Sequence, residues 1–228
     1  MLFSSTLLAQ DQYIFGYGSL MNTKSRNSSD EKMQGVPNIP VTLSRRFVDS
    51  QGDSYVRAWN YRAGSGFTAL GLRKVKHGQD ITGVIYQVGE SESDMANFDQ
   101  REEGYTREKV SSEFIHFENP QDYIPADSQI WVYIPKESSR PVAKYPLLQS
   151  YIDICISGAL EHSEEFAKKF ITTTEGWDTE YWLDDRLLAR RPWVYQKQYK
   201  QIHAILKQHT FLKNRKFSEE YAVFLGDQ

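Results

Sequence analysis

The chain has 228 residues, of which 39% are hydrophobic and 14% aromatic, and its formal net charge is −3. This composition excludes a disordered or low-complexity protein and allows one large domain or two small ones with a buried core. The single cysteine, Cys155, excludes an intrachain disulfide and fits a reducing compartment, so we expect a cytoplasmic protein. The N-terminal residues lack the basic start of a signal peptide, and no apolar run approaches the roughly 20 residues of a membrane-spanning helix.

Residues 1–136 are predicted to be mostly strand, with one central helix. β-Branched and aromatic residues between turn signals favour strands, in chain order, at 13–20, 40–49, 66–75, 81–88, 105–117 and 129–135. The sequence KHGQD between the third and fourth of these has the length of a hairpin loop and contains Gly78. A short helix is expected at 91–103, where Met95 and Phe98 lie three apart on one face.

The second part of the chain, residues 137–228, differs in character. Apolar residues recur at helical spacing across 147–173, and Gly158 is predicted to divide this stretch into two helices. The segment 175–193 carries three tryptophans and is expected to be ordered but irregular. A last helix is predicted at 193–209, so we expect this part to be mainly helical and packed on the first.

Charge is distributed unevenly along the chain. Residues 186–216 hold nine Lys or Arg and no acid, whereas residues 1–185 hold 18 basic and 27 acidic residues. We expect the basic stretch to dock on the acidic body, with an anionic substrate or protein partner as the alternative. The aromatic residues interleaved with these bases are also typical of single-stranded nucleic-acid binding, which is the least favoured of the three interpretations.

The segment YIFGYGSLM ends the first predicted strand and contains Tyr17, Gly18, Ser19 and Leu20. A Gly-x-Gly pattern after a strand is how a dinucleotide-binding loop begins, but the third glycine position is Met21 and a poor helix sequence follows. Two interpretations remain. The glycines either close a hairpin, or they form a turn whose backbone N–H groups converge on a carboxylate or an oxyanion.

Several short motifs, in this order, resemble the gamma-glutamylcyclotransferase-like superfamily. They are Tyr-Gly-Ser-Leu at 17–20, Gly-Val-Ile-Tyr at 83–86 and Phe-Asp-x-x-Glu at 98–102. The spelling REEGY is similar to ChaC-type and related bacterial members. The resemblance covers roughly residues 13–135 and implies an α+β fold, a mixed β-barrel with a flanking helix. It implies a barrel domain at 1–136 and a mainly helical extension at 137–228, similar to one in some bacterial relatives.

The resemblance also implies an activity, namely cyclisation of a gamma-glutamyl group to 5-oxoproline with release of an amine, amino acid or peptide. It implies that Glu102 is the catalytic base; counting back from the glycine instead selects Glu103. The residues implied to bind the small-molecule gamma-glutamyl substrate are Tyr17, Gly18, Ser19, Leu20, Tyr105 and Tyr133. No cofactor is implied, because the substrate carries its own nucleophile, and the five scattered histidines suggest no metal site.

The alternative function is a binding or regulatory module that keeps the barrel pocket without turnover. Neither the leaving half of the substrate nor the oligomeric state follows from the sequence.

Overall fold

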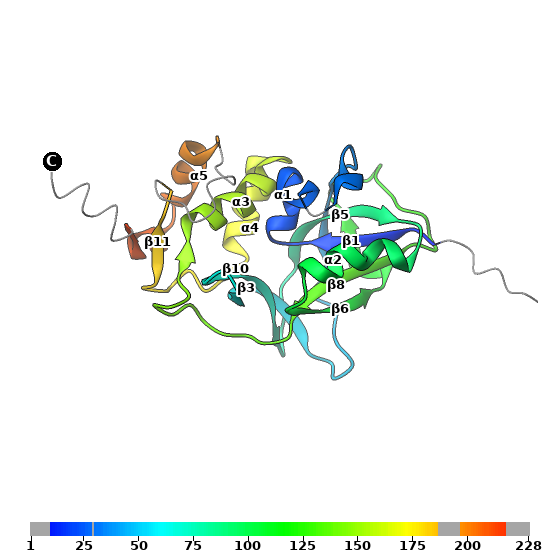
Figure 1. Cartoon of the computed structure of the whole chain (residues 1–228), viewed down its shortest axis with the longest axis horizontal. Helices are drawn as coiled ribbons and strands as arrows, with labels where there is room; N and C mark the ends of the chain where they lie inside the picture. The colour runs from blue at the N-terminus through cyan, green and yellow to red at the C-terminus, as the bar shows by residue number, and fades with distance from the viewer. Residues whose placement is uncertain (1–9, 29, 187–196, 218–228) are drawn as a thin grey trace, which may run out of the picture.

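The computed structural model describes residues 10–28, 30–186 and 197–217. Its largest sheet has six strands in the order β6-β8-β1-β5-β2-β7. They are β1 (Gln12–Gly16), β2 (Ile39–Leu43), β5 (Ile81–Gly89), β6 (Tyr105–Val110), β7 (Ile115–Phe117) and β8 (Gln129–Pro135). Neighbours are antiparallel except for β1 and β8, which run parallel, so the sheet is mixed, as expected (Figure 1).

Two smaller sheets have three strands each. One contains β10 (Thr174–Glu175), β3 (Ser54–Ala63) and β4 (Phe67–Val75), in that order. The other contains β12 (Arg215–Phe217), β11 (Trp182–Asp184) and β9 (Leu147–Leu148). The strand pair β3–β10 joins the two parts of the chain that the sequence analysis separates at residue 136. The boundary between domains 1–136 and 137–228 itself stays a prediction.

Helices α3 and α4 lie between the six-stranded sheet and the small sheet that contains β11 (Figure 1). The α-helices are α1 (Thr23–Asn27), α2 (Ala96–Arg101), α3 (Gln149–Leu160), α4 (Glu164–Thr172) and α5 (Tyr199–Leu206). Short 3₁₀ turns are η1 (Ser19–Met21), η2 (Glu31–Met33), η3 (Glu92–Met95), η4 (Ser112–Phe114) and η6 (Thr210–Asn214). Within the described ranges, no helix combines the length and apolar character needed to cross a membrane.

The expected closed barrel is not found. In the described part of the chain, the outer strands β6 and β7 of the six-stranded sheet do not pair with each other, so this sheet stays open. The predicted strand 105–117 is interrupted by η4, which lets its two halves occupy opposite edges. The predicted hairpin across KHGQD is also wrong, because β4 and β5 belong to different sheets. β4 pairs instead with β3, a strand that the sequence analysis does not predict.

Helix α3 runs through Gly158 rather than breaking there, so that prediction is wrong. A Cβ at this position would lie 2.4 Å from the backbone nitrogen of Asn22. The glycine therefore lets α3 pack directly against the backbone that follows η1. The break falls at 161–163 instead, where the side chain of Ser163 caps α4 by accepting a hydrogen bond from the Phe166 N–H at 3.0 Å.

Two arginines of the basic stretch, Arg186 and Arg215, pair with acidic residues of 1–185. The guanidinium of Arg186 lies 2.7 Å from a carboxylate oxygen of Asp153, and Arg215 lies 3.2 Å from Asp184. Asp153 is nearly fully buried in α3, and Asp184 lies in β11, so the two ion pairs tie Arg186 to α3 and Arg215 to β11. Arg190 and Arg191 lie outside the described residues.

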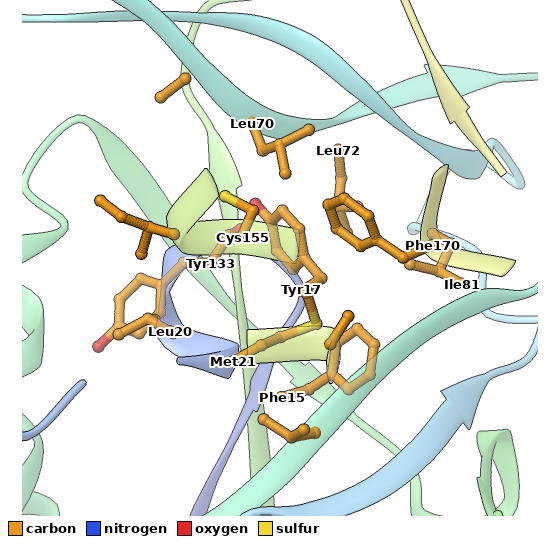
Figure 2. Close-up of a cluster of buried hydrophobic side chains, with 14 of the residues drawn as sticks. Phe15, Tyr17, Leu20, Met21, Leu70, Leu72, Ile81, Tyr133, Cys155 and Phe170 are labelled. Atoms are coloured by element: carbon orange, nitrogen blue, oxygen red, sulfur yellow. The ribbon is translucent and has the colours of Figure 1, made fainter. Parts of the chain in front are cut away.

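A single hydrophobic cluster connects the six-stranded sheet, the β3–β4 hairpin and the helices α3 and α4. Figure 2 shows Tyr17, which follows β1, among Leu70 and Leu72 of β4, Cys155 of α3 and Phe170 of α4. The loop that ends β1 is thus anchored inside the core, which gives the site described next a fixed frame.

Candidate active site

A small inner pocket lies where β1 ends. It is lined by Tyr17, Gly18, Ser19, Leu20, Glu102, Tyr105 and Tyr133, together with Phe15, Gly16, Leu70 and Tyr151. Every candidate substrate-binding residue from the sequence analysis and the first candidate base therefore share one pocket. These residues come from the β1–η1 loop, the end of α2, and the strands β6 and β8.

The loop after β1 is a tight turn into η1. The N–H of Met21 donates to the carbonyl of Gly18 at 3.0 Å, which closes the turn. A Cβ on Gly16 would lie 3.0 Å from the Cβ of Leu20, so a larger residue at 16 would crowd it. Among the described residues, the N–H groups of Gly18, Ser19 and Leu20 have no backbone acceptor. Gly18, Ser19 and Leu20 all line the inner pocket.

Glu102 is the C-cap residue of α2, and its N–H donates to the carbonyl of Phe98 at 2.9 Å. Phe98 is fully buried and anchors the helix in the core, which directs the Glu102 side chain into the pocket. The side chain of Glu102 is only 14% exposed. Burial raises the pKa of this carboxyl group above its ordinary value, and the adjacent Arg101 partly opposes that rise.

Glu103 has a different environment. It is exposed and does not line the inner pocket, and its backbone carbonyl accepts a hydrogen bond from Lys136 at 2.8 Å. Of the two candidate bases, only Glu102 reaches the pocket.

The hydroxyl groups of the pocket tyrosines donate hydrogen bonds to other protein groups, so these residues line the pocket mainly with their rings. The hydroxyl of Tyr17 donates to the carbonyl of Tyr133 at 2.6 Å, and that of Tyr105 donates to the carbonyl of Leu70 at 2.9 Å. The hydroxyl of Tyr133 donates to Asp99 at 2.8 Å. Burial raises the pKa of Tyr17 and Tyr105, so both stay neutral and form an aromatic wall around Glu102.

Tyr151 is a pocket residue that the sequence analysis does not identify. It lies in the first turns of α3, and its hydroxyl is 3.7 Å from where a Cβ on Gly18 would lie. Its ring packs against Phe67, with ring centroids 4.9 Å apart. In the sequence it belongs to the apolar stripe of 147–173, so the pattern indicates only a core residue.

An outer cavity of about 690 Å³ continues the inner pocket and shares Ser19, Glu102, Tyr105 and Tyr151 with it. The remaining lining residues are Ser28, Tyr61, Ala63, Ser65, Phe67, Ala69, Asn97, Gln100 and Arg101. The inner pocket has only about 30 Å³, enough for a water molecule or two. A substrate would therefore reach Glu102 from the outer cavity.

Three further observations concern features outside the inner pocket. A larger cavity of about 880 Å³, between Trp59, Trp177 and Arg140, contains none of the candidate residues. In the part of the chain that the structure describes, no group of three His, Cys, Asp or Glu side chains is arranged to hold a metal ion. The basic stretch predicts that Arg186, Arg190 or Arg191 lies nearest the rim of the pocket. Arg190 and Arg191 lie outside the described residues, and Arg186 lines neither the inner pocket nor the outer cavity.

The fold and the pocket define a protein of the gamma-glutamylcyclotransferase-like class. Residues 14–151, more than half of the chain, match the family model described as "Gamma-glutamyl cyclotransferase, AIG2-like", and the chain belongs to this family. The match ends at Tyr151, so it includes the pocket residue supplied by α3.

Solved structures show the same fold at low sequence identity. One is titled "Gamma-glutamyl cyclotransferase"; it is 13% identical with a TM-score of 0.53, and the match covers 87% of this chain and 99% of that one. Another is the uncharacterized protein loc79017 from Homo sapiens, 13% identical with a TM-score of 0.50, with coverage of 72% and 88%. No match was found among curated proteins. Coverage of 87% is more than residues 1–136 alone could supply, so the shared fold includes residues beyond 136.

Proposed function

We propose that this protein is a gamma-glutamylcyclotransferase, which cyclises the gamma-glutamyl group of a small molecule and releases 5-oxoproline. The observation that carries the proposal is the position of Glu102. Its side chain lines both the inner pocket and the outer cavity, beside the loop whose N–H groups lack backbone acceptors. A proton acceptor and a set of oxyanion donors are the two groups that this reaction requires.

In the proposed reaction, the alpha-amine of the substrate attacks its own gamma-carbonyl carbon. An alpha-ammonium group has a pKa of about 8 and is mostly protonated at neutral pH, so a base must first remove a proton. Glu102 is suited to this role because burial raises its pKa toward that of the amine. Holding the amine and carbonyl together in one bound molecule supplies much of the rate.

The loop would stabilise the oxygen of the attacked carbonyl. As the C–N bond to the amine forms, the electron pair of the C=O bond moves to oxygen, and the N–H groups of Gly18, Ser19 and Leu20 would bind the resulting oxyanion. Its collapse breaks the amide bond to the leaving half. Two protons pass from the attacking to the leaving nitrogen through Glu102, and the enzyme returns to its starting state.

The rings of the pocket tyrosines support this assignment by excluding water. Tyr17, Tyr105 and Tyr133 surround the carboxylate, and a water-poor site strengthens the interaction of the loop donors with the oxyanion. No step calls for a metal or an organic cofactor. The single cysteine of the sequence, Cys155, is buried, and this low cysteine content is in keeping with a cytoplasmic location.

One observation favours a second candidate, a binding or regulatory module without turnover. The inner pocket of about 30 Å³ is too small for a glutamyl group, so a ligand could be held in the outer cavity without reaching Gly18 and Leu20, which line only the inner pocket.

Incubation with a panel of gamma-glutamyl amino acids, peptides and amines separates the two candidates. Chromatographic detection of 5-oxoproline is expected with at least one compound, in an amount that matches the released half. Saturable binding of the panel without any 5-oxoproline would support the binding module instead.

A further inference from the structure

Arg101 forms an ion pair with the proposed base at the floor of the outer cavity. Its Nε lies 3.1 Å from a carboxylate oxygen of Glu102, and the two side chains are 23% and 14% exposed. Both residues line the outer cavity. A cation and an anion thus stand side by side where a substrate would enter the inner pocket.

The guanidinium of Arg101 is held in place by the loop and by α1. One terminal nitrogen donates to the carbonyl of Ser25 at 2.9 Å, and the other lies 3.4 Å from the hydroxyl oxygens of Ser19 and Ser25. A guanidinium presents five donors in a planar fork, which suits recognition of a carboxylate by two hydrogen bonds.

The gamma-glutamyl group carries complementary charges on one carbon, because its alpha-carbon bears both the ammonium and the carboxylate. We propose that Arg101 is the residue that binds the alpha-carboxylate of the substrate, while Glu102 faces the alpha-ammonium. On binding, the ion pair between Arg101 and Glu102 would be exchanged for two ion pairs with the zwitterionic substrate. This inference rests on the proposed function, since it takes the gamma-glutamyl group as the ligand.

The fully buried arginines Arg26 and Arg57 do not line the inner pocket or the outer cavity. Among the described residues that line the inner pocket and the outer cavity, Arg101 is the only base. Arg26 donates to Asn27, Asn38 and two backbone carbonyls below α1. Arg57 is fully buried and donates to three threonines and two backbone carbonyls. Carboxylate recognition at this site therefore falls to Arg101.

A pair of substrates tests the assignment without relying on overall activity. The two members are a gamma-glutamyl peptide with a free alpha-carboxylate and the same peptide with an alpha-carboxamide, and the readout is the ratio of their kcat/KM values. The wild-type protein is expected to favour the carboxylate by roughly 10- to 100-fold, the value of hydrogen bonds to a charged group. Arg101→Gln is expected to bring the ratio close to one, and Arg101→Lys to leave an intermediate ratio.

Arg107→Gln is the matched control. Arg107 pairs with Asp99 and Glu92 and lies over the ring of Trp131, outside the lining of the two cavities. Its variant is expected to keep the wild-type ratio. A general effect of Arg101→Gln on Glu102 or on folding would lower both rates and leave their ratio unchanged, which would overturn the proposal.

Binding of the same pair by calorimetry separates this inference from the proposed function. If wild-type protein prefers the carboxylate in binding, and Arg101→Gln loses that preference, the recognition role stands even where no 5-oxoproline is formed. Equal carboxylate preference in wild-type protein and Arg101→Gln would overturn it whether or not turnover is seen.

Discussion

Glu102 owes its chemical character to the side chains that bury it. Four tyrosines line the inner pocket with it, namely Tyr17, Tyr105, Tyr133 and Tyr151. Burial raises the pKa of its carboxyl group, while Arg101 acts in the opposite direction. Each named residue of the motif Phe-Asp-x-x-Glu has a separate structural role. Phe98 anchors α2 in the core, Asp99 accepts a hydrogen bond from Tyr133, and Glu102 ends the helix inside the pocket.

Replacing Glu102 by Gln keeps the shape of the side chain and removes the proton acceptor. Turnover is expected to fall roughly 10²- to 10⁴-fold, the usual contribution of a general base. Glu103→Gln is the paired control, and it should retain near wild-type turnover because Glu103 is exposed and outside the pocket. Both are measured by 5-oxoproline release at equal folded fraction. A dead Glu103 variant beside an active Glu102 variant would move the base by one residue.

The pH dependence of kcat/KM follows from the same residue. The base must be ionised, so activity is lost as pH falls through its pKa. Because burial raises that pKa, the acidic limb is expected above the ordinary glutamate value of about 4.3, and it should be absent from the residual activity of Glu102→Gln.

The Tyr133 hydroxyl is expected to be structural rather than catalytic. The Tyr133 hydroxyl donates to Asp99 of α2, and Asp99 also pairs with Arg107 at 3.3 Å. The hydroxyl therefore contacts α2. Tyr133→Phe should lower the free energy of unfolding by about 1 kcal/mol and leave kcat within a few-fold of wild type. Urea unfolding and 5-oxoproline release give the two values. A large loss of kcat at unchanged stability would instead place this hydroxyl in the reaction.

At the scale of elements, the sequence predicts strands best where local pattern and tertiary position agree. The predicted strands 66–75, 81–88 and 129–135 match β4, β5 and β8 within a residue. The strand β3 was missed because seven consecutive residues from Ser54 are buried, including Arg57 and Asn60, so it shows no apolar–polar alternation. A hairpin across KHGQD was predicted because loop length alone does not show that the chain changes sheets there.

The candidate site likewise contains residues that a local sequence motif predicts and a residue whose position depends on tertiary packing. The residues from 17 to 20 and Glu102 lie in short, local motifs, so the sequence alone is enough to propose them as candidates. Tyr151 belongs to a helix far along the chain, and its place beside Gly18 depends on how α3 packs against η1. That packing depends in turn on Gly158: a glycine within a helical pattern predicts a break, but here its missing Cβ allows close packing of α3.

Gly158→Ala is therefore expected to disturb both packing and site. The new Cβ would meet backbone atoms of Met21 and Asn22 at 2.6 and 2.4 Å, and backbone cannot move aside as a flexible side chain can. We expect a loss of about 1–3 kcal/mol in the free energy of unfolding, typical of overpacking, with reduced turnover because Met21 directly follows the loop.

Gly64→Ala is the control for that substitution, since a Cβ at this exposed turn position would meet nothing within 4 Å. It should leave both the urea midpoint and 5-oxoproline release unchanged. If Gly158→Ala behaved like this control, α3 would not brace the loop.

At the scale of the whole molecule, Arg57 connects parts that are distant in sequence. It lies in β3, is fully buried, and its guanidinium donates to the carbonyls of Thr82 in β5 and Phe170 in α4. Further bonds reach the hydroxyls of Thr173 and Thr174, and the guanidinium lies 4.1 Å from the centre of the Phe170 ring. One side chain thus joins the six-stranded sheet and the β10-β3-β4 sheet to the helical layer.

Arg57→Met tests whether this connection makes the chain one cooperative unit. Methionine removes the cost of burying a charge, but it leaves two backbone carbonyls and the threonine hydroxyls without their donor. The hydrogen-bond loss should prevail because no water replaces the donor in a closed core, and the free energy of unfolding should fall by about 2–4 kcal/mol. Arg73→Met is the matched control on the neighbouring strand β4. Arg73 pairs with Glu175 at a half-exposed position, so its loss should cost about 0–1 kcal/mol.

The same urea titration, followed by circular dichroism and by tryptophan fluorescence, addresses the predicted division at residue 136. Trp59 and Trp131 report on the first part of the chain, and Trp177 and Trp182 on the second. Because Arg57 and the β3–β10 pair cross this division, both probes are expected to show one coincident transition in wild-type protein. Arg57→Met should shift that transition to lower urea without splitting it. Two separate transitions in wild-type protein would show that residues 1–136 and 137–228 fold independently, and that Arg57 does not couple them.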